Sequence, residues 1–414
     1  MPKDDVLLFT EEMRKDYTIL IPNMLPIHFK LLCEMMNQKG YSFKLLENEN
    51  SNVVREGLKN VHNDTCYPAL VVIGQFLDAI KSGKYDTDKI ALAITQTGGG
   101  CRASNYINLL RKALKENGYG HIPVLSVSAN AMEKHPGFKL TPAIVISAIY
   151  SIVYGDLLMW LKNQSKPYEV NKGEVDKLVF SWENRLLLEY KQIRNLRLGK
   201  IRKNFIEIVK DFEKVRRSKE KKVKVGIVGE IFVKFSGVGN NNLEKFLEKE
   251  DCEIVLPGLL DFIIYTIDSR LMDYKLYGGN KFHLFWYNIA KKVMLRFQNQ
   301  INFIIKRYST YMPISRFEDV KSLVTNDYVS HGNKMGEGWL LTAEMLELCH
   351  MGVYNIVCAQ PFGCLPNHIV GRGMVRKIKE NIPNANIVAI DYDPSATKVN
   401  QENRIKLMLA NAKV

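Results

Sequence analysis

Short apolar runs alternate with amphipathic segments twice along this chain, and that alternation limits its possible folds more than any other feature. In the first 165 residues, the runs YTILIPNM, IALAITQT and IPVLSVSA are separated by segments of helical character such as PIHFKLLCEMMNQKG and SNYINLLRKALKENG. Strands that alternate with helices at this spacing predict a mostly parallel sheet covered by helices. Gly40, Gly83 and Gly118 stand where those helices should end.

A second alternating unit begins at Val223 with VKVGIVGEI and closes with NIVCAQPFGC, NIVAIDYD and a final helix. Between the two units, apolar residues recur at helical spacing among dense charges, as in KNFIEIVKDFEKVRRSKEKKVK. We therefore predict an α/β fold with two flavodoxin- or Rossmann-like lobes joined by a helical connector. The predicted first lobe covers residues 1–165, the connector 166–222 and the second lobe 223–414.

Composition narrows the class of protein. The chain has 414 residues, of which 46% are hydrophobic and 25% charged, so it can bury more than one core. The N-terminal segment carries charges where a secretory signal needs an apolar run, and no apolar run is long enough to span a membrane. We expect a soluble, cytoplasmic protein without a membrane partner. The seven cysteines are odd in number and widely spread, unlike a disulfide-stapled secreted domain.

The formal net charge of +14 raises the question of nucleic-acid binding. Much of the surplus lies between Lys191 and Lys234, where acidic residues are interleaved with the basic ones and no recognised nucleic-acid motif is present. We expect no nucleic-acid partner and interpret Lys200–Lys224 mainly as a solvated helix face. Docking of an acidic electron-donor protein or of the anionic groups of CoA is the alternative.

Three cysteines share one local context. Cys66 precedes Tyr67-Pro68, and proline favours the first positions of a helix. Cys101 ends a glycine-rich loop between a predicted strand and a predicted helix, and Cys364 follows the predicted strand at 355–359 just before another proline. All three should therefore lie where a helix begins.

Open α/β sheets bind ligands at the carboxyl ends of their strands, where helix N-termini also gather. We expect such an environment to favour thiolates, the form that ligates metals. Gly98, Gly99, Gly100 and Gly363 would let the backbone approach an inorganic cluster closely. An iron–sulfur cluster and a tetrahedral zinc both fit this chemistry, because no C-x-x-C pair decides between them. Buried structural cysteines are the simpler alternative.

Several segments resemble the 2-hydroxyacyl-CoA dehydratase D-component superfamily, and most closely the C-terminal region of large activase-related proteins that fuse an ATPase to a dehydratase-like region. The resemblance covers nearly the whole chain. It is most specific in CYP, QTGGGCR and QPFGCLPNH. The segments that carry it are NDTCYPALVVIGQF, ISAIYSIVYGDLLM, ITQTGGGCRASNYI, VGIVGEIFVKF, GEGWLLTAEM, QPFGCLPNHIVGRGM and IVAIDYDPSATKVNQENRIKLML.

The resemblance implies an iron–sulfur protein that receives low-potential electrons from an ATP-hydrolysing activator. The ligand positions that it implies are Cys66, Cys101 and Cys364, with Cys358 as a fourth ligand, a thiol behind the ligands or a buried strand residue. The cluster would be of the 4Fe-4S type. A double cubane, known in relatives, would need further cysteines or a second chain. We expect Cys33, Cys252 and Cys349 to pack in the core.

Other polar residues could serve such a site. Arg102 could offset cluster charge or hold a CoA phosphate, and His368 and Arg372 follow Cys364 about one turn apart. The loop SHGNKMGEGW could supply a proton donor from His331, Lys334 or Glu337, or could be a flexible connector.

Two further motifs have ordinary structural explanations. GVGNNN after the strand VKVGIVG resembles a phosphate-binding turn, but it lacks the G-x-G-x-x-G register, and its asparagines are more simply a helix cap. Asp391 and Asp393 could meet a ribose, but helix capping is the simpler role.

The sequence thus predicts an iron–sulfur redox protein that a separate activator reduces and that passes single electrons to a small substrate such as an acyl-CoA. We lean toward an enzyme, either a reductase or a dehydratase-like lyase component, working as a homodimer or heterodimer. The alternatives are a non-catalytic electron-relay subunit and a zinc-stabilised scaffold.

Overall fold

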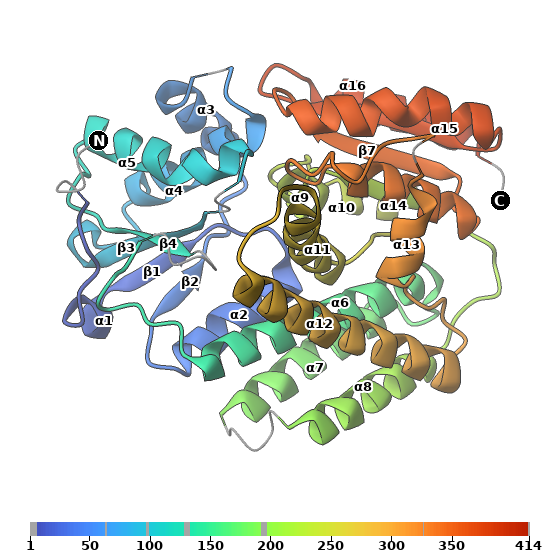
Figure 1. The fold of residues 1–414 in the computed structure, drawn as a ribbon, viewed down its shortest axis with the longest axis horizontal. Helices are drawn as coiled ribbons and strands as arrows, with labels where there is room; N and C mark the ends of the chain where they lie inside the picture. The colour runs from blue at the N-terminus through green and yellow to red at the C-terminus, as the bar shows by residue number, and fades with distance from the viewer. Residues whose placement is uncertain are drawn as a thin grey trace.

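The chain folds around two four-stranded parallel sheets. The structure, a computed structural model, describes residues 6–62, 64–96, 99–127, 133–191, 197–325 and 327–412. The strand orders are β2-β1-β3-β4 and β6-β5-β7-β8, and every pairing is parallel. Figure 1 shows one sheet in each half of the molecule, with helices around both. The predicted α/β class with two parallel-sheet lobes is confirmed.

The first sheet and the helices around it come from the N-terminal part of the chain. Its strands are β1 (Thr18–Ile21), β2 (Phe43–Leu45), β3 (Ile90–Thr95) and β4 (Val124–Val127). Its helices are α1 (Met13–Asp16), α2 (Pro26–Asn37), α3 (Ser51–Asn60), α4 (Tyr67–Lys81), η2 (Thr87–Lys89), η3 (Arg102–Asn105) and α5 (Tyr106–Glu116).

Three long helices and a short turn follow: α6 (Pro142–Ser165), η4 (Lys166–Tyr168), α7 (Glu174–Tyr190) and α8 (Leu198–Glu213). The second sheet has strands β5 (Lys224–Gly229), β6 (Glu253–Val255), β7 (Asn355–Pro361) and β8 (Asn386–Tyr392). Its helices are α9 (Ile231–Phe235), α10 (Leu243–Lys249), α11 (Leu259–Tyr277), α12 (Lys281–Tyr308), α13 (Phe317–Leu323), α14 (Trp339–His350), η6 (Asn367–Gly371), η7 (Arg372–Met374), α15 (Val375–Asn381) and α16 (Lys398–Ala410).

Both sheets are buried on both faces, as parallel sheets usually are. Along β3, Ala91 and Ala93 pack into one core cluster, whereas Ile90, Leu92 and Ile94 pack into the other. Each cluster also contains residues of the second sheet, because β5 and β7 divide their side chains in the same way. The two lobes therefore share continuous apolar cores.

Helix α6 joins the two halves through one buried carboxylate. His28 Nε2 on α2 lies 2.7 Å from Asp156 Oδ1 on α6. The backbone N–H groups of Leu259 and Leu260 donate to the two Asp156 oxygens at 2.8 Å each, so Asp156 also satisfies the first turn of α11. Since α6 packs on elements of both lobes, the lobe boundaries at residues 165 and 222 stay a prediction.

Helix α6 is also the one described helix whose length and composition would suit a membrane span. The candidate segment runs over Pro142–Tyr168, and 72% of its most apolar window is buried inside the structure. That burial identifies α6 as a core helix, because its apolar surface is already covered by protein.

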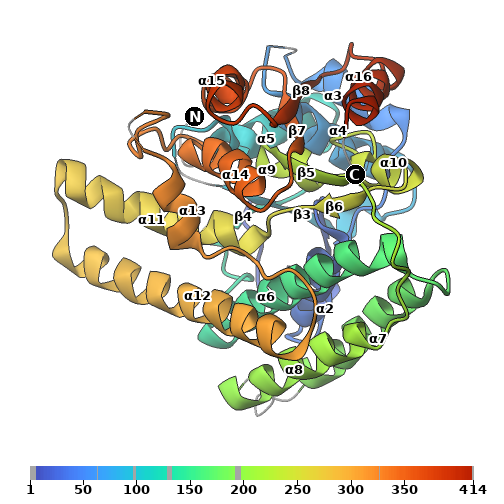
Figure 2. The same ribbon diagram turned by 90° about the vertical axis from the view of Figure 1, so that its right-hand side faces the viewer.

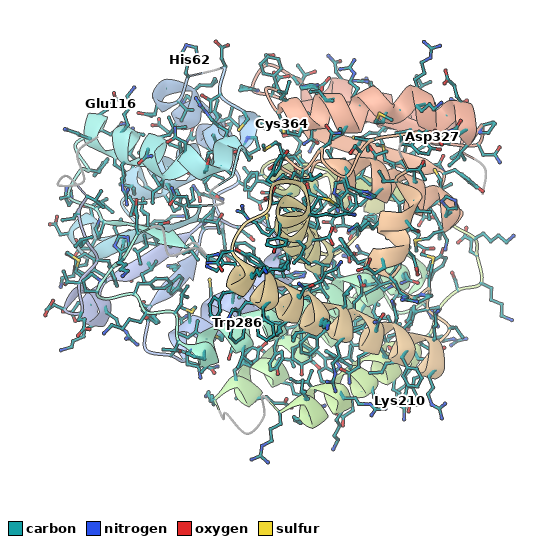
Figure 3. All side chains as sticks on the ribbon, viewed as in Figure 1. His62, Glu116, Lys210, Trp286, Asp327 and Cys364 are labelled. Carbon is teal, nitrogen blue, oxygen red and sulfur yellow. The ribbon has the colours of Figure 1, made fainter. Side chains whose placement is uncertain are left out.

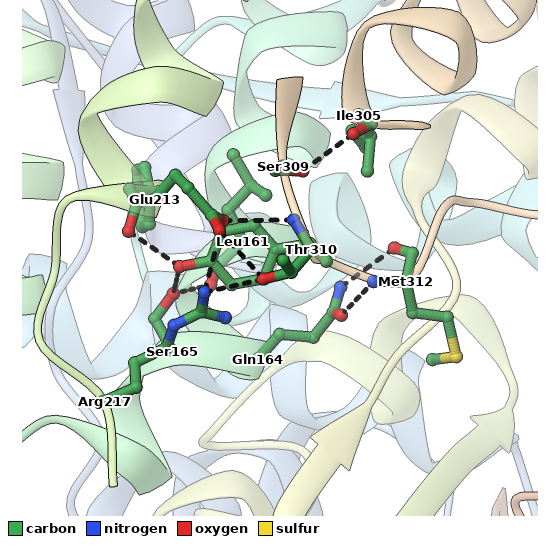
Figure 4. A network of polar contacts seen from close by, with 11 residues as sticks. Leu161, Gln164, Ser165, Glu213, Arg217, Ile305, Ser309, Thr310 and Met312 are labelled. Carbon is green, nitrogen blue, oxygen red and sulfur yellow. Dashed lines mark hydrogen bonds and ion pairs between the residues drawn. The ribbon is translucent and has the colours of Figure 1, made fainter. Parts of the chain in front are cut away.

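A polar network at the C-terminal ends of α6, α8 and α12 fixes these helices together (Figure 4). Thr310 donates from its backbone N–H and its hydroxyl to the Glu213 carboxylate, at 3.2 and 2.9 Å. Arg217 donates to the Thr310 hydroxyl at 2.9 Å, and Met312 N–H donates to Gln164 Oε1 at 2.8 Å. The helical layer under the sheets is thus tied at one end by hydrogen bonds as well as by packing.

We expect Asp156→Ala to lower the free energy of unfolding by about 3 kcal/mol, because it leaves His28 and two N–H groups of α11 buried without partners. Urea denaturation measures the change. Asp88→Ala is the matched control, because its exposed carboxylate lies 3.4 Å from His121, and it should cost less than about 1 kcal/mol. Equal losses in the two variants would contradict the role given to Asp156.

Candidate functional site

The structure places each of the three shared-context cysteines at the start of a helical segment. Cys66 is the residue before α4, and Cys101 is the residue before η3, in the loop that follows β3. Cys364 follows β7 and precedes η6. The loops after β3 and β7 each leave the carboxyl end of a central strand, one in each sheet, which is where α/β sheets bind ligands.

Cys66 and the loop of Cys364 touch across the two lobes. The Tyr67 N–H donates to the Phe362 carbonyl at 3.2 Å. Gly363 has φ +76°, and a Cβ there would lie 3.3 Å from the Cys66 Cα, so glycine suits both the backbone conformation and the close approach. Figure 3 shows Cys364 where the two halves of the molecule meet.

The segment from Ser330 to Gly338 covers this region from one side. A Cβ on Gly100 would lie 2.4 Å from the Met335 sulfur, and a Cβ on Gly336 would lie 3.6 Å from the Pro366 ring. The segment therefore contacts the loop of Cys101 and the loop of Cys364. Burial is the main cause of the raised pKa of the Cys101 thiol, and the charges of Glu337, Glu230 and Cys66 raise it further, so these groups lie close enough to Cys101 to interact electrostatically.

Two polar side chains lie within hydrogen-bonding distance of the thiol sulfurs. The Tyr106 hydroxyl is 3.0 Å from Cys66 Sγ, and the Asn367 amide donates to Cys364 Sγ at 3.2 Å. Burial raises the pKa of Tyr106 well above its usual value, so the phenol keeps its proton and acts as the donor to a thiolate. Asn367 Oδ1 is buried and has no partner in the described residues.

Two carboxyl groups stand beside the cysteines. Glu230 follows β5 directly, and its position depends on Gly229, where a Cβ would lie 1.9 Å from the Ala359 carbonyl oxygen. Glu337 accepts from the Ile231 N–H at 3.0 Å and from the Asn367 amide at 3.4 Å. Burial and the charge of Glu337 raise the pKa of Glu230 to about 8, and burial also raises the pKa of Glu337. Proton retention by these two groups would avoid adding negative charge beside the thiols.

The expectation that this location favours thiolates is wrong for the metal-free protein. Burial raises the pKa of Cys66 and Cys364, and it raises the pKa of Cys101 to about 12. Desolvation therefore outweighs the hydrogen bonds and the nearby helix termini. A bound cation would reverse this balance, because its charge stabilises the thiolates as their protons leave.

Cys358 lies inside β7 and is fully buried. Its sulfur would be 3.4 Å from a Cβ on Gly371, and burial raises the pKa of its thiol to about 12. The charges that act on it come from Glu344 and Asp391 and not from the other cysteines. Of the roles considered for Cys358, these surroundings favour a buried strand residue, and ligation by it stays a prediction.

Of the other predicted cofactor-binding residues, Arg102 is exposed. Burial raises the pKa of Cys66, and the charge of Arg102 opposes that rise, so Arg102 lies within reach of the site. His368 is half-buried on η6. Gly99 is exposed in open space, and Gly98 lies outside the described residues.

Three of the polar residues predicted to serve the site are bound to partners away from the cysteines. Arg372 pairs with Asp391 at 3.1 Å, Lys334 pairs with Asp273 on α11, and His331 Nε2 lies 3.1 Å from the Lys321 carbonyl. Among His331, Lys334 and Glu337, which were predicted to reach the site, Glu337 contacts a residue of the site, since it accepts from the Asn367 amide.

The three thiols can be tested for their fit to a metal ion or to a cluster. Within the described ranges, no group of three or more His, Cys, Asp or Glu side chains gathers tightly enough to hold an ion. An iron–sulfur cluster takes its thiolates at separate iron atoms, so its ligands need not converge on one point. The three thiols, the hydrogen-bond donors on two of them and the unpaired Asn367 oxygen are consistent with such a group.

The sequence did not indicate Tyr106, Glu230 or Asn367. Glu230 could have been found, since it directly follows a predicted strand at the carboxyl edge of the sheet. A search with protein-family models finds no match to the chain, and a search of curated proteins finds none either.

We expect Tyr106→Phe to slow alkylation of Cys66 in the metal-free protein about fivefold at fixed pH, because loss of a hydrogen bond of about 1 kcal/mol raises the thiol pKa further. Iodoacetamide labelling followed by peptide mass spectrometry measures the rate. Tyr119→Phe is the control, and alkylation of Cys364 should be unchanged in both variants. An unchanged Cys66 rate would contradict the assigned hydrogen bond.

Glu230→Gln should flatten the pH dependence of stability of the metal-free protein. The folded-state pKa of Glu230 is raised from 4.5 to about 8, so unfolding releases its proton between those values, and the free energy of unfolding falls as pH rises through them. Glutamine does not titrate and can still accept from the Val233 N–H. Urea denaturation across this range tests the difference, with Glu116→Gln as the control. Parallel curves for wild type and Glu230→Gln would refute the buried proton.

Proposed function

We propose that this chain is an iron–sulfur redox protein that holds a 4Fe-4S cluster on Cys66, Cys101 and Cys364 in the gap between its lobes. The observation that carries the proposal is the contact of Cys66 with the Cys364 loop, beside a segment that also contacts the Cys101 loop. Donors from Tyr106 and Asn367 on two of the sulfurs add support. The segments that resemble the dehydratase superfamily add support from the sequence.

The cluster, when bound, would supply single electrons at low potential. The chain's own residues would prepare its site. Tyr106 and Asn367 would donate to the ligand sulfurs, and such hydrogen bonds are one of the means by which proteins set cluster potentials. Met335, packed on Gly100, would limit the access of water to the loop of Cys101. Glu230 and Glu337 would hold protons near the sulfurs without adding charge.

The proposal includes the partners and the location expected from the sequence. A separate ATP-hydrolysing activator would reduce the cluster, and a small substrate such as an acyl-CoA would accept the electrons. Three protein ligands would leave one iron open for that substrate. The protein would act in the cytoplasm as a homodimer or with a related subunit.

A non-catalytic electron relay is the second candidate. It is favoured by the burial of Cys66, which is 8% exposed, and by the cover that Met335 places over the Cys101 loop. A relay needs a shielded cluster and no substrate pocket, whereas catalysis needs an open iron.

Anaerobic reconstitution with iron and sulfide tests the proposal. We expect the wild-type protein to gain iron, acid-labile sulfide and a reducible electron paramagnetic resonance signal. Cys66→Ala, Cys101→Ala and Cys364→Ala should each lose most of the iron, because each removes a thiolate from a three-thiolate site.

Cys33→Ala is the matched control, since Cys33 is buried on α2 in the first lobe, and it should keep the iron content of the wild type. Tight binding of zinc with no cluster would contradict the proposal, as would full cluster content in the Cys66, Cys101 and Cys364 variants. ATP-dependent reduction by an activator that is followed by turnover of an acyl-CoA would separate catalysis from relay.

A further inference from the structure

Helices α11 and α12 form an antiparallel hairpin whose tip projects from the body of the protein (Figure 2). The turn is built for a sharp reversal. Gly278 has φ +74° at the end of α11, and the Asn280 side chain accepts from the Phe282 N–H at 2.8 Å to cap α12. The tip, defined here as residues 274–296, is thus a well-formed element and not a loose loop.

The tip exposes large apolar side chains. Tyr277 is 79% exposed, Phe282 64%, Phe285 59% and Trp286 53%. The Trp286 ring meets those of Phe282 and Phe285 at centroid distances of 6.1 and 5.6 Å, so the three form one cluster in water. Figure 3 places Trp286 on this outer part of α12. A contiguous exposed aromatic cluster marks an interaction surface.

The tip itself carries basic residues and no acidic ones. No aspartate or glutamate occurs from Tyr274 to Phe317. Lys291 pairs with Asp268 and Glu318, which lie outside the tip. Lys275, Lys281, Lys292 and Arg296 are exposed, and within the described part of the chain none of these four has an ion pair.

We propose that the hairpin tip docks on an anionic phospholipid surface, with the aromatic cluster at the headgroup level and the lysines on the lipid phosphates. Exposed tryptophan, tyrosine and phenylalanine beside lysine are the side chains that settle at membrane interfaces. A projecting tip can reach a flat surface without a matching groove, and negative lipids attract such basic clusters. The surface would be peripheral, and it departs from our expectation of no membrane partner.

Two other occupants fit the tip less well. A second copy of this face would bring its unpaired cations against each other, which is unfavourable. A protein partner is less well matched by a surface rich in lysine, since lysine is depleted in protein interfaces. Asp273, the residue directly before the tip, pairs with Lys334 of the Ser330–Gly338 segment, so a membrane bound at the tip would lie near that segment.

Trp286 provides a local reporter, because Trp160, Trp182 and Trp339, the other three tryptophans, are buried. The purified full chain is mixed with vesicles of phosphatidylcholine alone or of phosphatidylcholine with phosphatidylglycerol. We expect sedimentation with the phosphatidylglycerol vesicles only, a blue shift of tryptophan emission on binding, and release by added salt. Trp286→Phe should keep the binding and lose the shift.

The paired variants Lys275→Glu/Lys281→Glu and Phe285→Ser/Trp286→Ser should each weaken vesicle binding at least tenfold. Lys219→Glu/Lys221→Glu matches the first pair in charge change, and Leu407→Ser removes an exposed apolar side chain from α16; both controls should bind like the wild type.

The proposal is overturned if the anionic vesicles bind no protein, which would leave a protein partner as the occupant. It is also overturned if the controls lose as much binding as the tip variants. A blue shift that grows with protein concentration in the absence of lipid, together with a doubled mass, would assign the tip to self-association instead.

Discussion

The arrangement of the two lobes depends on one buried carboxylate. Asp156, in the middle of α6, lies against His28 of the first lobe and accepts both N–H groups that begin α11 in the second. A buried charge is costly unless it is fully hydrogen-bonded, so this group stabilises only the arrangement in which all three partners are present. In that arrangement the loops that follow β3 and β7 both contact the segment from Ser330 to Gly338.

The chemistry of the gap follows from burial as much as from the residues in it. The same burial that raises the thiol pKa values raises the pKa of Glu230 to about 8 and also raises that of Glu337. Thiols in such a site would release their protons when a cationic centre binds. Electrostatic balance therefore depends on what the gap holds, which is the property that a redox cluster site needs.

Local sequence signals were enough to predict the sheets and the starts of the helices. Each of these signals lies within a few residues of the cysteine it describes. They are the strand before Cys101, the proline after Cys66, and the strand and proline around Cys364, and the structure has the corresponding elements. The lining of the site was not predictable in this way. Tyr106 contacts Cys66 from 40 residues away along the chain, and Glu337 contacts Ile231 from 106 residues away.

The wrong expectation of stabilised thiolates has the same origin. A helix start can be read from neighbouring residues, but the desolvation of a thiol depends on every element packed around it. Lys334 and Arg372 show the same limit, because Asp273 and Asp391 hold them in ion pairs that the sequence spacing does not indicate. The exposed aromatic tip of α12 was equally hidden, since its residues follow the pattern of a packed helix.

The central claim is that Cys66, Cys101 and Cys364 share one gap, and thiol cross-linking in the metal-free protein tests it most directly. A short bifunctional maleimide, followed by digestion and peptide mass spectrometry, should join Cys364 to Cys66 and to Cys101 and should leave Cys33 and Cys252 unlinked. Absence of both links, or links that join these thiols only to other molecules, would contradict the claim.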